Sequence, residues 1–204
     1  MAEQPLYKKP YFDSGVFIGW IKKERIPQKD EDGNIMIGED GKEIIAEERG
    51  MIAEHLLTLA EQRVFPVVIS GLTIAEVHKR RGKEKLMNDE NQNVLDYFEH
   101  DFVNVVPIDR KIGEEANKLC RKYEAEKLSP NNAIHLACAK KAGCDVLLSW
   151  DGPLNSIKDP GIRIEKPIMW VPPEKIKPMM QIPLLEELSL EKKSQKQEKE
   201  ESNQ

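Results

Sequence analysis

The sequence predicts an α/β fold in which helices cover a small, mainly parallel sheet. Short apolar runs alternate along the chain with longer amphipathic stretches, an order typical of β–α–β crossovers. One predicted helix is clearly bounded, since Ser129-Pro130 provides an N-cap followed by proline at the first helical position and Gly143 follows its end. The 204 residues are enough for one domain with attachments.

Each element follows from its own pattern. Five apolar runs are predicted strands: residues 11–12, 67–69, 103–106, 146–148 and 162–164. Six amphipathic stretches are predicted helices: residues 16–23, 47–63, 74–80, 84–99, 110–126 and 130–142. Strands and helices of these lengths in this order place the strands side by side in one covered sheet.

Three segments depart from this alternation. Residues 1–166 form the predicted domain, and residues 27–45 are a predicted β-hairpin insertion with turns at Asp32-Gly33 and Asp40-Gly41. The insertion is acidic, which favours a solvated hairpin. Prolines at five positions in 167–190 predict an extended segment, and the charged residues 191–204 predict a disordered tail. The extension and tail could bind a partner protein or join two copies of the chain in a homodimer.

Composition limits the classes of function. The net charge of −5 gives no global attraction to nucleic acid, so binding would need a local basic patch or metal ions. No apolar run is long enough to span a bilayer, and the first nine residues lack the features of a secretion signal. Cys120, Cys138 and Cys144 have no paired spacing, which predicts reduced thiols. We therefore expect a cytoplasmic protein with no membrane segment.

Three acids follow predicted strands: Asp13 the first, Glu76 the second and Asp151 the fourth. Ligands of open parallel sheets bind beyond the carboxyl ends of the strands, so folding should bring these acids together. Neighbouring carboxylates suit Mg²⁺ or Mn²⁺, and such an ion activates water and neutralises charge on a phosphate. The pattern predicts phosphodiester chemistry. Helix capping is the alternative for each: Asp13 and Asp151 as N-caps, and Glu76 in a capping box with Thr73.

Four segments carry a resemblance to a known family. They read Phe-Asp-Ser-Gly-Val-Phe-Ile at 12–18, Leu-Thr-Ile-Ala-Glu-Val at 72–77, Pro-Asn-Asn-Ala-Ile-His-Leu-Ala at 130–137, and Leu-Ser-Trp-Asp at 148–151. In this order, across residues 8–165, they resemble the motifs of the PIN-domain ribonucleases, which include the VapC-like toxins of toxin–antitoxin pairs. The resemblance implies a three-layer fold, a Mg²⁺ or Mn²⁺ site, cleavage of RNA and an antitoxin partner.

The resemblance also implies roles for individual residues. Asp13, Glu76 and Asp151 match the acids of the family and would bind the metal. Asn132 stands where the family usually has aspartate. Its amide oxygen can bind a cation but adds no charge and cannot act as a base. The change implies either a weakened ribonuclease or, as the alternative, an inactive PIN-like module that binds RNA or protein.

Other side chains complete the predicted site. A basic stretch follows Glu76 and could hold the phosphate backbone; the alternative is a solvated helix end. Its five cations are Lys79, Arg80, Arg81, Lys83 and Lys85. Ser14 and Ser149 could bind phosphate or metal-bound water, or simply form turns. We interpret His135 as a packed helix residue, Trp150 as a cover for the sheet edge and Asp109 as a helix cap.

Overall fold

The computed structural model describes residues 7–77, 79–81, 84–85, 88–158 and 160–170. The chain divides into two units. One is Tyr7–Met169; the other combines Met1–Leu6 with Trp170–Gln204, and of this second unit only Trp170 is described. The predicted extension beyond residue 170 and the predicted tail therefore lie outside the described residues.

A five-stranded parallel sheet forms the centre of the first unit. Its strands are β1 (Pro10–Phe12), β4 (Val67–Ser70), β7 (Val103–Val106), β8 (Val146–Leu148) and β9 (Arg163–Glu165), in the spatial order β7-β4-β1-β8-β9. All four neighbouring pairs run parallel, and Tyr11 on the central strand is level with Val68 on one side and Leu147 on the other. The predicted fold class and all five predicted strands are confirmed.

Seven helices connect the described strands. They are α1 (Ser14–Lys22), α2 (Arg49–Glu61), α3 (Gly71–Glu76), α4 (Asn88–Phe98), α5 (Arg110–Lys122), α6 (Pro130–Lys141) and α7 (Gly152–Asn155). Ser129 caps α6 ahead of Pro130, and Gly143 after it has a positive φ of 65°, both as the sequence predicts. The short α7 was not predicted, because four residues are too few for a periodic pattern.

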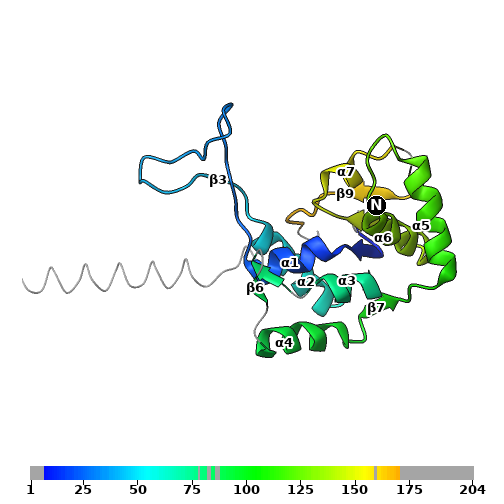
Figure 1. Ribbon diagram of the computed structural model, residues 1–204. Coiled ribbons are helices and arrows are strands. Elements are labelled where there is room, and N and C mark those ends of the chain that lie inside the picture. The colour runs from blue at the N-terminus through cyan, green and yellow to red at the C-terminus, as the bar shows by residue number, and fades with distance from the viewer. Residues whose placement is uncertain (1–6, 78, 82–83, 86–87, 159, 171–204) are drawn as a thin grey trace, which may run out of the picture. The chain divides into compact units, whose positions relative to one another are not determined.

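The sheet is covered on both faces, which gives three layers (Figure 1). Side chains of successive strand residues point to opposite faces. Tyr11, Val68 and Leu147 belong to a core cluster with buried side chains of α5 and α6. The next residue of β1, Phe12, packs against Phe17 of α1 on the other face, and Phe17 in turn contacts Phe98 of α4. Within the described residues, no helix is long and apolar enough to cross a membrane.

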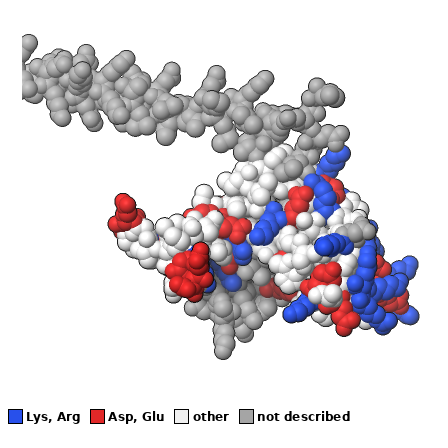
Figure 2. Space-filling view, turned by 90° about the horizontal axis from the view of Figure 1, so that it is seen from above, with Lys and Arg blue, Asp and Glu red and all other residues white. Residues whose placement is uncertain are grey.

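The predicted insertion forms an arm that reaches away from the sheet (Figure 1). β2 (Ile26–Pro27) and β3 (Ile45–Glu47) pair antiparallel at its root, and bridges Lys29↔Ile35 and Ile37↔Glu43 close two small hairpins beyond them. Gly33 and Gly41 have positive φ in the two turns, where glycine adopts that conformation without strain. Figure 2 shows the acidic side chains at two separate tips. No residue from 26 to 49 is buried.

The basic stretch is the main departure from the predicted elements. Residues 79–80 and 84–85 were expected at helix ends, but Lys79–Arg81 is a strand, β5, paired antiparallel with β6 (Glu84–Lys85). Charged residues of this kind fit a helix end and a short strand equally well, and only the antiparallel pairing of the two segments distinguishes them. α3 accordingly ends at Glu76, and α4 begins only at Asn88.

Candidate active site

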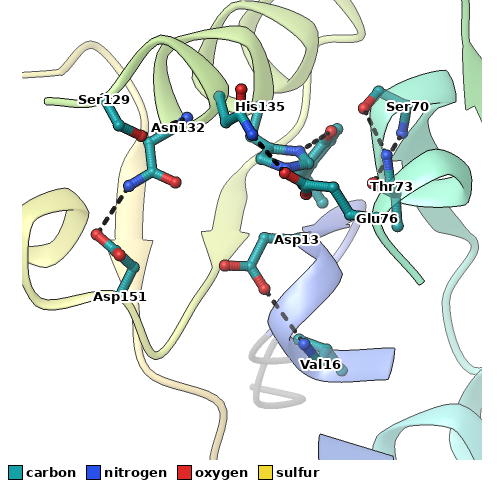
Figure 3. Close-up of polar contacts among 11 residues, drawn as sticks. Asp13, Val16, Ser70, Thr73, Glu76, Ser129, Asn132, His135 and Asp151 are labelled. Atoms are coloured by element: carbon teal, nitrogen blue, oxygen red, sulfur yellow. Dashed lines mark hydrogen bonds and ion pairs between the residues drawn. The ribbon is translucent and has the colours of Figure 1, made fainter. Parts of the chain in front are cut away.

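The candidate site lies where three parallel strands end. Asp13 directly follows β1, Asp151 lies three residues beyond β8, and Glu76 is the last residue of α3, which begins directly after β4. Because β1 lies between β4 and β8, these three strand ends are neighbours on one edge of the sheet. In Figure 3, Asn132 points toward Asp151, the Asp13 carboxylate lies opposite them, and Glu76 is directed at His135.

Asp13 is a buried carboxylate that caps a helix. It is the N-cap of α1, where its side chain accepts a hydrogen bond from the backbone N–H of Val16, and it is 6% exposed. Burial raises the pKa of Asp13 above its usual value, and a hydrogen bond from Ser149 opposes that rise. A Cβ at Gly15 would lie 3.0 Å from Oδ1 of Asp13, so glycine there leaves room for the carboxylate.

Asp151 is bound by the amide that replaces the expected aspartate. Nδ2 of Asn132 donates to Oδ1 of Asp151 at 2.9 Å, and the same oxygen accepts from the backbone N–H of Leu154 as the N-cap of α7 (Figure 3). The backbone N–H of Asp151 donates to Oγ of Ser149 at 3.0 Å. Ser149 is fully buried, and because it also donates to Asp13, it links Asp13 to the turn that carries Asp151.

Asp13, Asn132 and Asp151 line one open pocket of about 300 Å³. The rest of its wall comes from Ser14, Gly15, Ile18, Glu24, Arg49 and Trp150. Among the described residues that line it, Arg49 is the one cation. The pocket thus combines carboxylate and amide oxygens with a single guanidinium, a set that suits a cation with a bound phosphate.

Glu76 lies at the edge of this group, and both of its oxygens are occupied. Nδ2 of Asn131 donates to Oε1 at 2.7 Å, Nε2 of His135 is 3.1 Å from Oε2, and Ser14 of the pocket wall also donates to the carboxylate. These donors, His135 first, hold the pKa of Glu76 below its usual value. The capping box of α3 is made by Ser70 and Thr73, so Glu76 is not needed as a cap.

His135 connects the site to the core. It is 2% exposed, as its interpretation as a packed residue requires, yet it also bridges Oε2 of Glu76 and the hydroxyl of Tyr11, whose oxygen is 2.8 Å from Nδ1. The sequence did not indicate this contact, because the neighbours of His135 in the chain are apolar and favour a packed residue. The one available signal was spacing: Asn131 and His135 are four residues apart and so lie on the same face of α6.

Arg49 was missed by the sequence analysis. Its Nε donates to Glu47 at 2.9 Å, its NH1 is 3.4 Å from Glu24, and its guanidinium lies 5.3 Å from the ring centre of Trp150. Nε1 of Trp150 donates to Glu47 at 2.7 Å. Trp150 is buried and held by these contacts, while its role as a cover for the sheet edge stays a prediction. This network joins the root of the arm to the pocket, a contact between residues 103 positions apart that no local pattern indicates.

The residues present fit a hard divalent cation in their donor chemistry. Asp13 is a buried carboxylate whose charge is disfavoured by desolvation, and a cation beside it would remove that penalty. Oxygen atoms of Asp13, Asp151 and Asn132 are ligands that Mg²⁺ and Mn²⁺ prefer. However, no group of three or more His, Cys, Asp or Glu side chains in the described part of the chain is arranged to hold a metal. Glu76 faces its own donors, and position 132 supplies an amide.

The comparison with protein families decides the identity of this fold. The family model of the PIN domain matches residues 43–159, more than half of the chain. The chain belongs to the PIN domain family. The matched range includes Glu76, Asn132 and Asp151, whereas Asp13 precedes it. The resemblance to the PIN family is thereby confirmed, with three of the four sequence segments inside the matched range and residues 12–18 before it.

Solved structures similar to this PIN domain share little sequence with it. A toxin–antitoxin complex from Klebsiella pneumoniae has 18% identity and a TM-score of 0.48, over 79% of this chain and 99% of that one. The Mycobacterium tuberculosis toxin VapC20, described as cleaving the sarcin-ricin loop, has 13% identity and a TM-score of 0.49, over 71% and 92%. No curated protein matches the chain.

The remaining predicted residues have mixed outcomes. Asp109 is the N-cap of α5, and the three cysteines are free thiols, as predicted. Ser14 binds Glu76, and Ser149 binds Asp13 while its Oγ also accepts the Asp151 N–H in a turn. Lys83 lies outside the described residues, as do the side chains of the other four cations of the basic stretch; their binding of RNA stays a prediction.

Proposed function

We propose that this PIN domain is a metal-dependent endoribonuclease that cleaves RNA phosphodiester bonds. The observation that carries the proposal is the pocket in which Asp13, Asn132 and Asp151 meet at the carboxyl edge of a parallel sheet, in a chain of the PIN family. Bound Mg²⁺ or Mn²⁺ would supply an activated water and neutralise charge developing on the phosphate.

The chain's own residues have distinct parts in this proposal. Asp13 and Asp151 hold the cation through carboxylate oxygens and Asn132 through its amide oxygen. Arg49 faces the phosphate from the pocket wall, since its guanidinium is fixed by Glu24, Glu47 and the ring of Trp150. Glu76 stays ionised because its hydrogen-bond donors lower its pKa, and it contributes negative charge at the edge of the pocket.

The biological setting is also part of the proposal. We infer a cytoplasmic toxin of the VapC-like branch, held in check by an antitoxin protein, with RNA as the substrate. The hairpin of β5 and β6 begins three residues after Glu76. Its sequence brings five cations within seven residues, which would hold the RNA backbone. A homodimer joined through the extension stays a prediction of the same kind.

One observation favours a second candidate, an inactive PIN module that binds RNA or protein. The amide of Asn132 already donates to Asp151, so this carboxylate has a partner without any cation. Such a module would retain RNA equally well with and without a chelator.

The deciding experiment compares the natural protein with Asn132→Asp on a panel of structured RNAs in the presence of Mn²⁺. We expect slow cleavage by the natural protein and cleavage at least 10-fold faster by the variant, both abolished by EDTA and by a further Asp13→Asn change. No cleavage by either protein, with chelator-insensitive RNA retention, would reject catalysis in favour of the binding module.

A further inference from the structure

Both oxygens of Glu76 are held by side chains from one face of α6. Asn131 donates to Oε1 at 2.7 Å, and His135, one turn further along the helix, approaches Oε2 at 3.1 Å. Residues four apart on a helix point the same way, so the two form a clamp whose spacing is fixed by backbone geometry. Glu76 itself is 25% exposed in its side chain, while His135 is 2% exposed.

The hydrogen-bond partners assign the protons of the clamp. An ionised carboxylate can only accept, so Nε2 of His135 must carry a proton and donate to Glu76. In a neutral imidazole, Nδ1 is then the acceptor, and the hydroxyl of Tyr11 donates to it across 2.8 Å. The Tyr11 hydroxyl is in turn hydrogen-bonded with Ser70 and Thr73. The chain of donors therefore runs in one direction, from Tyr11 through His135 to Glu76.

Tyr11 places a polar hydroxyl inside the core, where a strand residue would usually be wholly apolar. It is fully buried in the centre of β1, with a core cluster around it, and its hydroxyl is a polar group that burial would penalise without a partner. The same strand continues directly into Asp13. One strand therefore supplies an acid of the pocket and, two residues earlier, the hydroxyl that orients the clamp on another acid.

We propose that Tyr11 and His135 are positioning residues of the nuclease reaction, which hold the Glu76 carboxylate in one orientation beside the pocket. The inference rests on the proposed function and names residues that act through Glu76 without touching the substrate. Their removal should lower kcat and leave KM nearly unchanged, because RNA contacts are not altered. A merely structural role would lower stability alone.

Kinetics test the role in the Asn132→Asp background, where the higher rate allows a decrease to be measured. Tyr11→Phe keeps the ring and its 5.8 Å aromatic contact with His135 but loses the hydroxyl. We expect kcat to fall about 3- to 10-fold with Tyr11→Phe and at least 10-fold with His135→Leu. His135→Gln should recover part of the rate, because its amide can still donate to Glu76. Ile112→Val, in the same core cluster, is the stability-matched control and should leave kcat unchanged.

A spectroscopic readout tests the clamp without any dependence on catalysis. In long-range ¹H–¹⁵N NMR spectra of the labelled natural protein, Nε2 of His135 should carry the proton of the hydrogen bond to Glu76, and the Nδ1 signal should move in Tyr11→Phe. The opposite tautomer would overturn the proposal, as would unchanged kcat in both Tyr11→Phe and His135→Leu. The predicted tautomer without cleavage by any variant would instead reject the nuclease and, with it, any role of the clamp in a reaction.

Discussion

At the residue scale, Asp13 and Asp151 each serve two purposes. Both cap a helix with the side chain, and both line the pocket. Capping and metal binding were alternatives in the sequence, but one carboxylate can do both, because the backbone N–H takes one lone pair and leaves others free. The cap then holds a proposed metal ligand in one orientation beyond the end of a strand.

The burial of Asp13 gives a prediction about stability and pH. Its pKa is higher in the folded state than the unfolded value of 3.8, so its ionisation destabilises the fold. The penalty is absent below pH 3.8 and grows until the pH passes the folded pKa. Asp13→Asn, which keeps a capping oxygen, should therefore stabilise the metal-free protein at pH 7 by ~1 kcal/mol or more. Thermal unfolding at pH 7 and pH 3.5 should show this gain at the higher pH only; an equal gain at both would contradict the explanation.

Glu76 should behave in the opposite sense. Because its folded pKa is lowered from 4.5, its ionised form stabilises the fold above that pH, and the contribution is lost as the pH falls through the folded pKa. Glu76→Gln should thus destabilise the protein at pH 7, by roughly 0.5–2 kcal/mol for the weakened hydrogen bonds. Urea unfolding at pH 7 and pH 3.5 measures this difference, and a destabilisation of equal size at the lower pH would be inconsistent with it.

At the element scale, the three inner strands β4, β1 and β8 were predictable because each is short, almost wholly apolar and fully buried. The outer strands β7 and β9 are partly exposed, and short apolar runs still indicated them. The β5–β6 hairpin was not predictable, since its charged residues fit an amphipathic pattern as well as a strand and only pairing with another segment separates the two. The same limit applies to the clamp and to the Arg49 network. Asp13 and Asp151 could be found because they follow strands, and Asn132 because of its motif at the start of α6. Tyr11 and Arg49, in contrast, acquire their roles through contacts across distant segments.

The junction between α1 and α2 gives an element-scale prediction. A Cβ at Gly50 would lie 2.6 Å from Cα of Lys23, a backbone atom that cannot move aside. Gly50→Ala should therefore destabilise the fold by about 1–3 kcal/mol, as overpacking does. Gly113→Ala in α5 is the matched control, because nothing lies within 4 Å of its Cβ. That change should stabilise by about 0.5–1 kcal/mol. Chemical unfolding of both variants measures the contrast, and similar effects would contradict the packing described.

The arm gives a second prediction at this scale. Replacing residues 27–45 with a short Gly-Ser linker should change the melting temperature by only a few degrees, because no residue of the arm is buried. Glu47→Ala at its root should destabilise more, by roughly 1–3 kcal/mol, since Trp150 and Arg49 lose their acceptor. Calorimetry of the two proteins tests the order of these effects; a larger destabilisation from the linker would show that the arm supports the core.

At the scale of the whole molecule, charge is unevenly distributed. The chain carries −5 overall, yet Lys79 to Lys85 is strongly basic and the tips of the arm are acidic (Figure 2). The proposed RNA substrate would therefore have to be held locally. Changing Lys79, Arg80 and Arg81 to Gln should weaken RNA binding and reduce the dependence of log K on log salt by about 0.7 for each phosphate that these side chains no longer neutralise.

A matched control separates the location of charge from its amount. Removing three positive charges from exposed residues of α5, Arg110, Lys118 and Arg121, should leave RNA binding nearly unchanged. Fluorescence anisotropy across a salt series measures both proteins. Equal weakening by the two triple variants would show that net charge, and not the β5–β6 hairpin, governs binding.

Calorimetric titration of Mn²⁺ tests the central claim most directly, that position 132 decides whether Asp13 and Asp151 hold a divalent ion. The natural protein should bind weakly, Asn132→Asp at least 10-fold more tightly, and the further change Asp13→Asn should remove that gain. Equal affinities for the natural protein and Asn132→Asp, or a gain that survives the removal of the Asp13 carboxylate, would contradict a shared site.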